Sequence, residues 1–279
     1  MSHATVGEVL RAGVKTLSDS KIESAARDAR LLMAYVLEVD PSRMTLLLQD
    51  DLLDEKKASF QVLIAERSKR RPVAQIIGRR QFYGRVFEVS GDVLDPRGDT
   101  ETLVEAALNE DFERVLDLGT GSGCIVLSLL AERAGAQGVG ADMSAAALSV
   151  AGRNAEALGV VGRVTFVLSD WFEKLEGRFD LIVSNPPYIA ADEMSDLQPE
   201  LVYEPRIALT DEADGLSAYR VICRDAVDYL KPNGRLMFEI GAGQAADVSE
   251  MMRAVGFGEL QVLSDLEGRD RVVWGRKTA

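Results

Sequence analysis

Residues 115–130 read VLDLGTGSGCIVLSLL, an apolar run that ends in a glycine-rich loop and then continues as a second apolar run. Gly119, Gly121 and Gly123 allow tight turns and a close approach of the backbone to a ligand. The pattern predicts a strand, a ligand-binding loop and the first turn of a helix. Such units build sheets of parallel strands that bind ligands at their carboxyl edge.

Further runs of strand length follow from the same point of the chain onward. We expect strands at residues 114–118, 138–142, 164–168, 179–184, 235–240, 260–263 and 271–274. The first four alternate with helical stretches, which predicts a parallel sheet built from right-handed crossovers. Only the residues SDLEGRD separate the last two, which is too short for a helical crossover, so that pair should be antiparallel.

The N-terminal part of the chain has a helical pattern instead. Apolar residues at helical spacing follow Ser20, Asp40-Pro41 and Asp54, and we expect the two aspartates to cap helices. The next residues alternate like a hairpin with a glycine-containing turn. We therefore divide the chain into a helical domain (1–78), a β-hairpin linker (79–95) and an α/β domain (96–279).

Acidic residues follow the strand candidates next to the glycine loop. The loop spacing, G-x-G-x-G, is shorter than the dinucleotide fingerprint and suits a nucleoside without a pyrophosphate. Asp142 ends the next strand candidate, where a carboxylate can accept hydrogen bonds from a ribose diol. Asp170 can accept from an adenine amino group, and Trp171 can pack on the adenine ring. Together these residues predict a nucleoside-type cofactor.

The composition excludes several classes of protein. Of the 279 residues, 47% are apolar and 28% are charged, which is typical of a globular protein. No stretch is long and apolar enough for a membrane span, and we see no secretory signal. Cys124 and Cys223 lie far apart, which suits a reducing cytoplasm and excludes a disulfide framework or a zinc site. With His3 as the single histidine, histidine-based catalytic triads and metal centres are excluded.

Charge is distributed unevenly along the chain. The net charge of −13 argues against long DNA or RNA as the main ligand, because nucleic-acid binders need a cationic surface. One basic run contains no acid: Arg67, Lys69, Arg70, Arg71, Arg79, Arg80 and Arg85. This run is either a solvated helix end with its loop or a docking patch for an acidic partner.

The segment Asn185-Pro186-Pro187-Tyr188 directly follows the strand candidate at 179–184. An amide or ring-conjugated nitrogen is a poor nucleophile because its lone pair is delocalised. The Asn185 side-chain oxygen and the Pro186 carbonyl could accept from its two N–H bonds, and Tyr188 could stack on the planar group. Positioning and fixed dipoles would then provide the catalysis. The alternative is a rigid turn with Tyr188 as a packing residue.

The glycine loop with Asp142 and Asp170 resembles the cofactor site of class I S-adenosylmethionine-dependent methyltransferases. The resemblance implies a Rossmann-like sheet of seven strands in the order 3-2-1-4-5-7-6, with the last-numbered strand antiparallel. The Asn-Pro-Pro-Tyr motif is similar to that of both adenine-N6 and glutamine-N5 methyltransferases. By itself, the motif leaves the target nitrogen open.

Six further segments together resemble the HemK/PrmC family, which methylates the Gly-Gly-Gln glutamine of class I peptide-chain release factors. They are RPVAQIIGRRQFYGRVFEV (71–89), DPRGDTETLVE (95–105), NPPYI (185–189), EPRIALTDEADGLSAYR (204–220), LKPNGRLMFEIGAGQ (230–244) and DLEGRDRVV (265–273). The resemblance covers nearly the whole chain. The other possible functions are adenine methylation, and binding of a translation factor without catalysis.

The family resemblance implies a set of site residues and partners. Cofactor contacts are implied for Phe87, Arg97, Thr100, Gly119, Thr120, Gly121, Gly123, Asp142, Asp170, Trp171 and Asn185. Substrate contacts are implied for Glu101, Asn185, Pro186, Pro187 and Tyr188, of which Asn185, Pro186 and Tyr188 are catalytic. The product is S-adenosylhomocysteine, and no metal is implied. We expect a cytoplasmic monomer whose N-terminal helices help to dock the release factor, without stable nucleic-acid binding.

One loop departs from the family pattern Pro-Arg-Pro-Asp/Glu-Thr-Glu. Here it reads Pro96-Arg97-Gly98-Asp99-Thr100-Glu101, and Gly98 loosens a loop that proline would stiffen. Arg97 is otherwise a surface charge, and we expect Asp99 to cap a helix. Glu204-Pro205 either ends a loop or belongs to the site.

Overall fold

The computed structural model describes residues 4–278, so His3 lies outside the described residues. The chain forms two compact units. The first contains the N-terminal residues to Gly78 together with the segment 198–203, and the second contains the remainder. The hairpin that follows Gly78 therefore belongs to the second unit.

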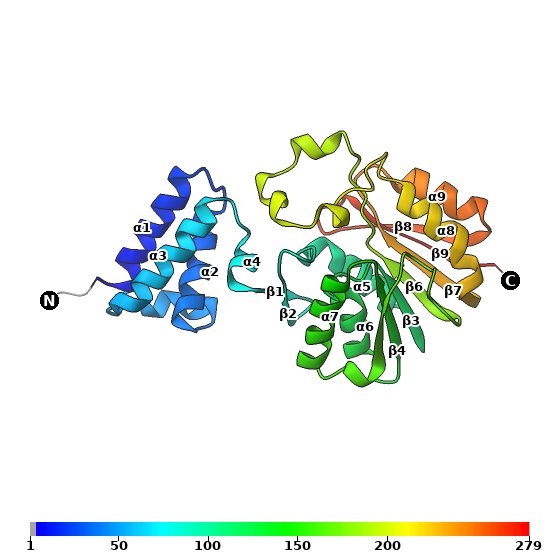
Figure 1. The fold of residues 1–279 in the computed structure, drawn as a ribbon, viewed down its shortest axis with the longest axis horizontal. Coiled ribbons are helices and arrows are strands. Elements are labelled where there is room, and N and C mark those ends of the chain that lie inside the picture. The colour runs from blue at the N-terminus through cyan, green and yellow to red at the C-terminus, as the bar shows by residue number, and fades with distance from the viewer. Residues whose placement is uncertain (1–3, 279) are drawn as a thin grey trace. The chain divides into compact units, whose positions relative to one another are not determined.

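Helices pack around an apolar core in the first unit (Figure 1). They are α1 (Val6–Asp19), α2 (Ala25–Leu37), the 3-10 helix η1 (Pro41–Leu47), α3 (Asp54–Ser68) and α4 (Val73–Ile77). Asp40 caps η1 as predicted, because its carboxylate accepts the Ser42 N–H at 2.8 Å. The prediction that Asp54 caps the following helix is wrong, because Leu53 occupies the cap position and Asp54 is already helical.

Arg67 is a buried ion-pair centre of the first unit. Its guanidinium donates to Asp28 at 2.8 Å and to Glu200 at 3.1 Å. Arg70 also donates to Glu200, at 3.3 Å, and the Tyr203 hydroxyl donates to the Lys69 carbonyl. Arg67 is thus committed to internal contacts, which hold the segment 198–203 on this unit.

A sheet of seven strands forms the centre of the second unit. Its strands are β3 (Arg114–Leu118), β4 (Gln137–Asp142), β5 (Val164–Leu168), β6 (Phe179–Ser184), β7 (Leu230–Glu239), β8 (Phe257–Ser264) and β9 (Asp270–Lys277). The order β5-β4-β3-β6-β7-β9-β8 equals 3-2-1-4-5-7-6 when β3 is counted as the first. This confirms the predicted order. β9 runs antiparallel to both neighbours, which confirms the prediction that the last two strands pair antiparallel.

Strand bounds agree best where turn residues flank an apolar run. The bounds of β3, β5 and β6 are those predicted. β7 begins five residues before the predicted strand at 235, counting from Leu230. Its first half contains Pro232 and Asn233, the latter with a positive φ of 61°, and its pairing with β6 shifts register there. Turn-type residues therefore hid the start of this strand.

Helices cover both faces of the sheet (Figure 1). One face packs on α5 (Glu101–Leu108), α6 (Cys124–Glu132) and α7 (Ala145–Ala157), and the other on α8 (Ser217–Tyr229) and α9 (Ala245–Ala254). Side chains alternate accordingly along β3, where Val115 joins the first face and Leu116 the second. This arrangement leaves the carboxyl edge of the sheet to the connecting loops.

Shorter elements complete the second unit. They are the hairpin strands β1 (Arg79–Phe82) and β2 (Arg85–Glu88), and the 3-10 helices η2 (Gly98–Thr100), η3 (Val161–Arg163), η4 (Glu193–Asp196) and η6 (Arg206–Ala208). The helix η5 (Pro199–Tyr203) belongs to the first unit. Between Ala4 and Thr278, no helix is long and apolar enough to cross a membrane.

Candidate active site

A cavity of about 470 Å³ lies at the carboxyl edge of β3, β4 and β6. Predicted site residues from five separate segments line it: Arg97, Thr100, Gly119, Thr120, Gly121, Asp142, Asp170, Trp171, Asn185 and Pro187. Further wall residues come from the ranges 92–96 and 205–212, which the sequence did not assign to the cofactor. Its volume is within the range of small-molecule sites.

The glycine loop after β3 has the backbone that its sequence predicts. Gly123 has φ +80°, and a Cβ there would lie 2.9 Å from the Leu127 side chain and 3.2 Å from Ala151. Only glycine fits this position without displacing the first turn of α6. Gly123 therefore packs against Leu127 and Ala151 and sets the path of the loop backbone, and it is not a wall residue of the cavity.

Two carboxylates hold this loop in place. Asp142 accepts the Gly121 N–H and the Ser144 N–H, both at 2.9 Å. The fully buried Asp117 accepts the Thr120 hydroxyl at 2.7 Å and the Val126 N–H at 3.3 Å. Burial raises the Asp117 pKa to about 7, although both hydrogen bonds lower it. The loop is thus fixed by side chains from its own strand and from the neighbouring strand.

The Asn-Pro-Pro-Tyr segment starts directly after β6. The Asn185 carboxamide lines the cavity and donates from Nδ2 to the Thr100 hydroxyl at 3.4 Å. Pro186 is buried. The Tyr188 carbonyl accepts from the Gln244 side chain at 2.9 Å, which fixes the far end of the segment.

Gly215 and Gly241 pack directly against Tyr188. A Cβ on Gly215, whose φ is +74°, would lie 2.3 Å from the Tyr188 carbonyl oxygen. A Cβ on Gly241 would lie 3.0 Å from the Tyr188 ring. Gly215 is therefore required by the close packing of the motif, and Gly241 allows the Tyr188 ring to pack closely. Burial raises the pKa of its hydroxyl to about 12.

Some predicted residues lie outside the cavity wall. The Phe87 side chain, which the resemblance places over the cofactor, is fully buried and packs edge-on against Phe82 in the core. It points inward because the hairpin packs that face onto the second unit. Glu101 accepts the Tyr83 N–H at 2.8 Å, which joins α5 to the hairpin. Pro186 and Tyr188 likewise lie beside the cavity and not among its wall residues.

The loop before α5 is held by ion pairs. Arg97 donates to both oxygens of Glu204, at 2.6 and 2.7 Å, and the Glu204 side chain is only 1% exposed. Burial raises the pKa of Glu204 to about 7, and the charge of Arg97 acts against that rise. The prediction that Asp99 caps a helix is wrong, because Asp99 instead pairs with Arg269 and Arg271, each at 3.3 Å.

Sequence reasoning missed one buried acid beside Asn185. Glu239 ends β7 and is 1% exposed, and its carboxyl interacts with the side chains of Thr100 and Asn185. The available signal was a glutamate at the end of an apolar strand at the ligand-binding edge. Cys124 also lines the cavity, but burial raises its pKa to about 12, so the thiol stays protonated.

These residues fit a nucleoside-type cofactor. The backbone at Gly119 is open, because nothing lies within 4 Å of the position a Cβ would occupy. The carboxylate of Asp142 and the half-buried ring of Trp171 face the same cavity. This donor set suits a ribose diol and an adenine ring and contains no phosphate-binding cation in the loop itself.

The sheet order, the glycine loop and the acidic residues at its strand ends define a class I methyltransferase, whose methyl donor is S-adenosylmethionine. The PrmC N-terminal domain profile matches residues 8–78, and the methyltransferase small domain profile matches residues 86–215. The chain belongs to the family of release factor glutamine methyltransferases.

Two relatives support this assignment, and one solved structure supports the fold. The release factor glutamine methyltransferase of Cereibacter sphaeroides is 53% identical over 273 residues, which cover 98% of each chain. That of Rhodospirillum rubrum is 42% identical over 284 residues, which cover 100% of this chain and 87% of the relative. A methyltransferase structure from Pyrococcus furiosus has a TM-score of 0.56 at 15% identity, covering 78% of this chain and 98% of that chain, and it supports the fold alone.

Proposed function

We propose that this chain transfers a methyl group from S-adenosylmethionine to the side-chain amide nitrogen, N5, of the glutamine in the Gly-Gly-Gln loop of class I peptide-chain release factors. The observation that carries the proposal is the Asn-Pro-Pro-Tyr segment after β6, at a cavity that the glycine loop after β3 also lines. The names and the near-complete coverage of the relatives support the choice of substrate.

In the proposed mechanism, Asn185 and Pro186 orient the substrate amide. The Asn185 Oδ1 and the Pro186 carbonyl accept the two N–H bonds of the glutamine amide, which favours pyramidal nitrogen. S-adenosylmethionine supplies an electrophilic methyl group on its sulfonium. The acceptors also stabilise the positive charge that develops on the attacking nitrogen. Tyr188 stacks on the amide plane, and the prolines keep the segment stiff.

The remaining predicted residues bind the cofactor in this proposal. Asp142 would accept from the ribose diol, Asp170 would accept from the adenine amino group, and Trp171 would pack on the ring. Arg97 and Thr100 flank the cofactor from the loop before α5. Their positions in the cavity wall support these roles. Phe87 and Glu101 contribute through the packing of the hairpin and α5.

We further propose that the helical first unit docks the release factor and that the enzyme is a cytoplasmic monomer. The match of residues 8–78 to the PrmC N-terminal domain supports a role for this unit. The free buried thiols of Cys124 and Cys223 suit a reducing compartment. The net charge of −13 opposes stable binding to nucleic acid.

The experiment presents the purified protein and radiolabelled S-adenosylmethionine with three acceptors side by side. They are a class I release factor, the same factor with its loop glutamine replaced, and DNA. We expect label only in the intact release factor, at a single glutamine identified by mass spectrometry. Label in DNA would favour adenine methylation, and equal label in the glutamine-replaced factor would contradict the proposed target.

A further inference from the structure

Glu239 is a buried acid beside Asn185, because the residues that precede the two, Phe238 and Ser184, are paired across β7 and β6. It ends β7 at the carboxyl edge, where it pairs with Val272 of β9, and it is 1% exposed. The side chains of Thr100 and Asn185 both lie beside this carboxyl and favour its ionised form. Asn185 also donates to Thr100 at 3.4 Å, so the three side chains form one cluster.

The Glu239 carboxyl favours one of the two possible orientations of the Asn185 carboxamide. A carboxamide has a donating NH₂ end and an accepting oxygen end. Above a pH of about 7 the Glu239 carboxyl is ionised and only accepts hydrogen bonds, so it favours the Nδ2 end of Asn185 and turns Oδ1 away. Asn185 is a wall residue of the cavity, and its Nδ2 end is engaged by Thr100 at 3.4 Å, so Oδ1 is the end left for a ligand. The oxygen is therefore presented where an amide N–H is to be bound.

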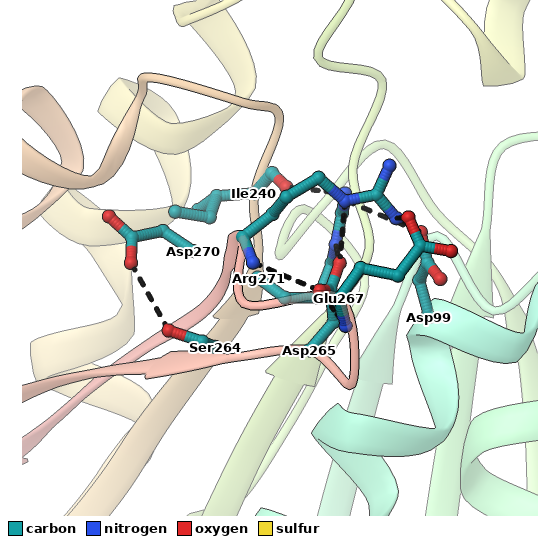
Figure 2. Close-up of polar contacts among 8 residues, drawn as sticks. Asp99, Ile240, Ser264, Asp265, Glu267, Asp270 and Arg271 are labelled. Atoms are coloured by element: carbon teal, nitrogen blue, oxygen red, sulfur yellow. Dashed lines mark hydrogen bonds and ion pairs between the residues drawn. The ribbon is translucent and has the colours of Figure 1, made fainter.

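Arg271 supports the ionised form of Glu239. Figure 2 shows the Arg271 side chain between Asp99, the turn after β8 and the end of β7. Its guanidinium donates to Asp265 at 3.2 Å and to the Ile240 carbonyl at 3.1 Å, and it pairs with Asp99 at 3.3 Å. Burial raises the Glu239 pKa to about 7, whereas the Thr100 hydrogen bond and the Arg271 charge lower it.

One oxygen of Glu239 has no partner within residues 4–278. Oε2 is buried and makes no hydrogen bond in this part of the chain. A buried acceptor without a donor costs stability, and an apolar residue would fill a core position at lower cost. A glutamate at this position despite that cost indicates a role beyond packing.

We propose that Glu239 is a positioning residue that holds the Asn185 carboxamide with its Oδ1 toward the substrate amide. The proposal rests on the proposed function, because Asn185 is the substrate acceptor in it. Glu239 touches neither substrate nor cofactor in this role and acts through Asn185 alone. It therefore affects the rate of methyl transfer and leaves cofactor affinity nearly unchanged.

The test compares Glu239→Leu and Glu239→Gln with wild type in single-turnover methylation of the release factor. Leu removes the acceptor, and we expect a loss in rate of about 100-fold, as for the loss of one preorganised polar contact. Gln keeps one acceptor oxygen but adds a donor, and we expect its rate to lie between the two. Affinity for S-adenosylhomocysteine, measured by calorimetry, should stay within about threefold.

A double-mutant cycle with Asn185→Ala distinguishes positioning from general damage. In the Asn185→Ala background, we expect Glu239→Leu to cause no further loss, because its target is already absent. A full additional loss in that background would overturn the proposal, as would an unchanged rate in the single variant. The free energy of unfolding of each variant, measured by urea denaturation, controls for the loss of stability.

The outcomes also separate this proposal from the proposed function. If wild type leaves the release factor unlabelled, the proposed function fails and the variants need no comparison. If wild type transfers the methyl group and Glu239→Leu does so equally fast, only the positioning role fails. Should Glu239→Leu not fold, the test uses Glu239→Gln, which keeps the side-chain volume. A wild-type rate of methyl transfer in Glu239→Gln overturns the positioning role.

Discussion

Asn185 is the residue on which the proposed chemistry depends, and it carries no charge. Its carboxamide oxygen and the neighbouring Pro186 carbonyl are acceptors of fixed direction. A neutral acceptor binds an amide N–H without attracting the cations that a carboxylate would attract. Two charged groups, Glu239 and Arg271, interact with each other near Asn185 and are not wall residues of the cavity. In the proposed mechanism, the reacting atoms are held by dipoles, and the charge of Glu239 orients the Asn185 dipole.

Buried carboxyls with raised pKa values make the stability of the protein depend on pH. Burial raises the pKa of Asp117, Glu204 and Glu239 to about 7, from ordinary values of 3.8 for Asp and 4.5 for Glu. The folded state therefore holds protons that the unfolded state has already lost. The stability that these groups contribute is fully present below the unfolded pKa and is lost as the pH rises through about 7.

We expect the free energy of unfolding to fall as the pH rises from 5 to 7, and to fall less steeply in Glu239→Gln. Each titrating group contributes at most about 1.4 kcal/mol per pH unit in this window. Urea denaturation at several pH values measures the slope. Parallel slopes for wild type and variant would show that Glu239 does not retain its proton in the folded state.

At the scale of elements, the loop before α5 is held at each end by an ion pair. Arg97 pairs with Glu204, which precedes η6, and Asp99 pairs with Arg271 of β9. The Gly98 between them is exposed, and nothing lies within 4 Å of the position of a Cβ. Side-chain contacts thus fix a loop whose backbone is intrinsically loose at Gly98.

Gly98→Pro should stabilise the protein by about 0.4–1 kcal/mol, because proline restricts the unfolded chain. The position accepts proline: Gly98 is the first residue of η2, and Arg97 before it is extended, with φ −98° and ψ 145°. Thermal unfolding measures the gain, with Gly98→Ala as the control for the added Cβ. A lower midpoint for Gly98→Pro than for Gly98→Ala would show that the loop needs glycine.

Elements with strong local signals were predictable, and contacts distant in sequence were not. The apolar runs of β3, β5 and β6 gave correct bounds, whereas Pro232 and Asn233 concealed the start of β7. Arg97 and Glu204 are 107 residues apart, and no periodic pattern connects them. Asp99 looked like a helix cap because its partners are distant in sequence: Arg269 lies in the turn before β9 and Arg271 lies on β9.

At the scale of the whole molecule, the division into units differs from a division by sequence position. The segment 198–203 belongs to the helical unit, because Glu200 pairs with Arg67 and Arg70 there. The hairpin 79–88 packs within the second unit. The basic run that the sequence singled out is used in part inside the fold. Reversing the charge of Arg70 to test this run as a docking patch would therefore also break the ion pair of Arg70 with Glu200.

The candidate site was predictable to the extent that its residues follow strands directly. Asp142, Asp170 and Asn185 each come at or after a strand end, and parallel strands bring such ends to one edge. Glu239 also ends a strand, but its role depends on which side chain of a neighbouring strand it meets. That contact follows from strand order and register together, and the local pattern contains neither.

The most direct test of the account is the rate of methyl transfer to the release factor by Asn185→Ala, measured in single turnover beside cofactor affinity. We predict a loss of about 100-fold or more in rate, because the acceptor for the substrate amide is gone. Affinity for S-adenosylmethionine should change by less than about threefold, because the glycine loop and Asp142 remain. Methyl transfer at the wild-type rate in this variant would contradict the account.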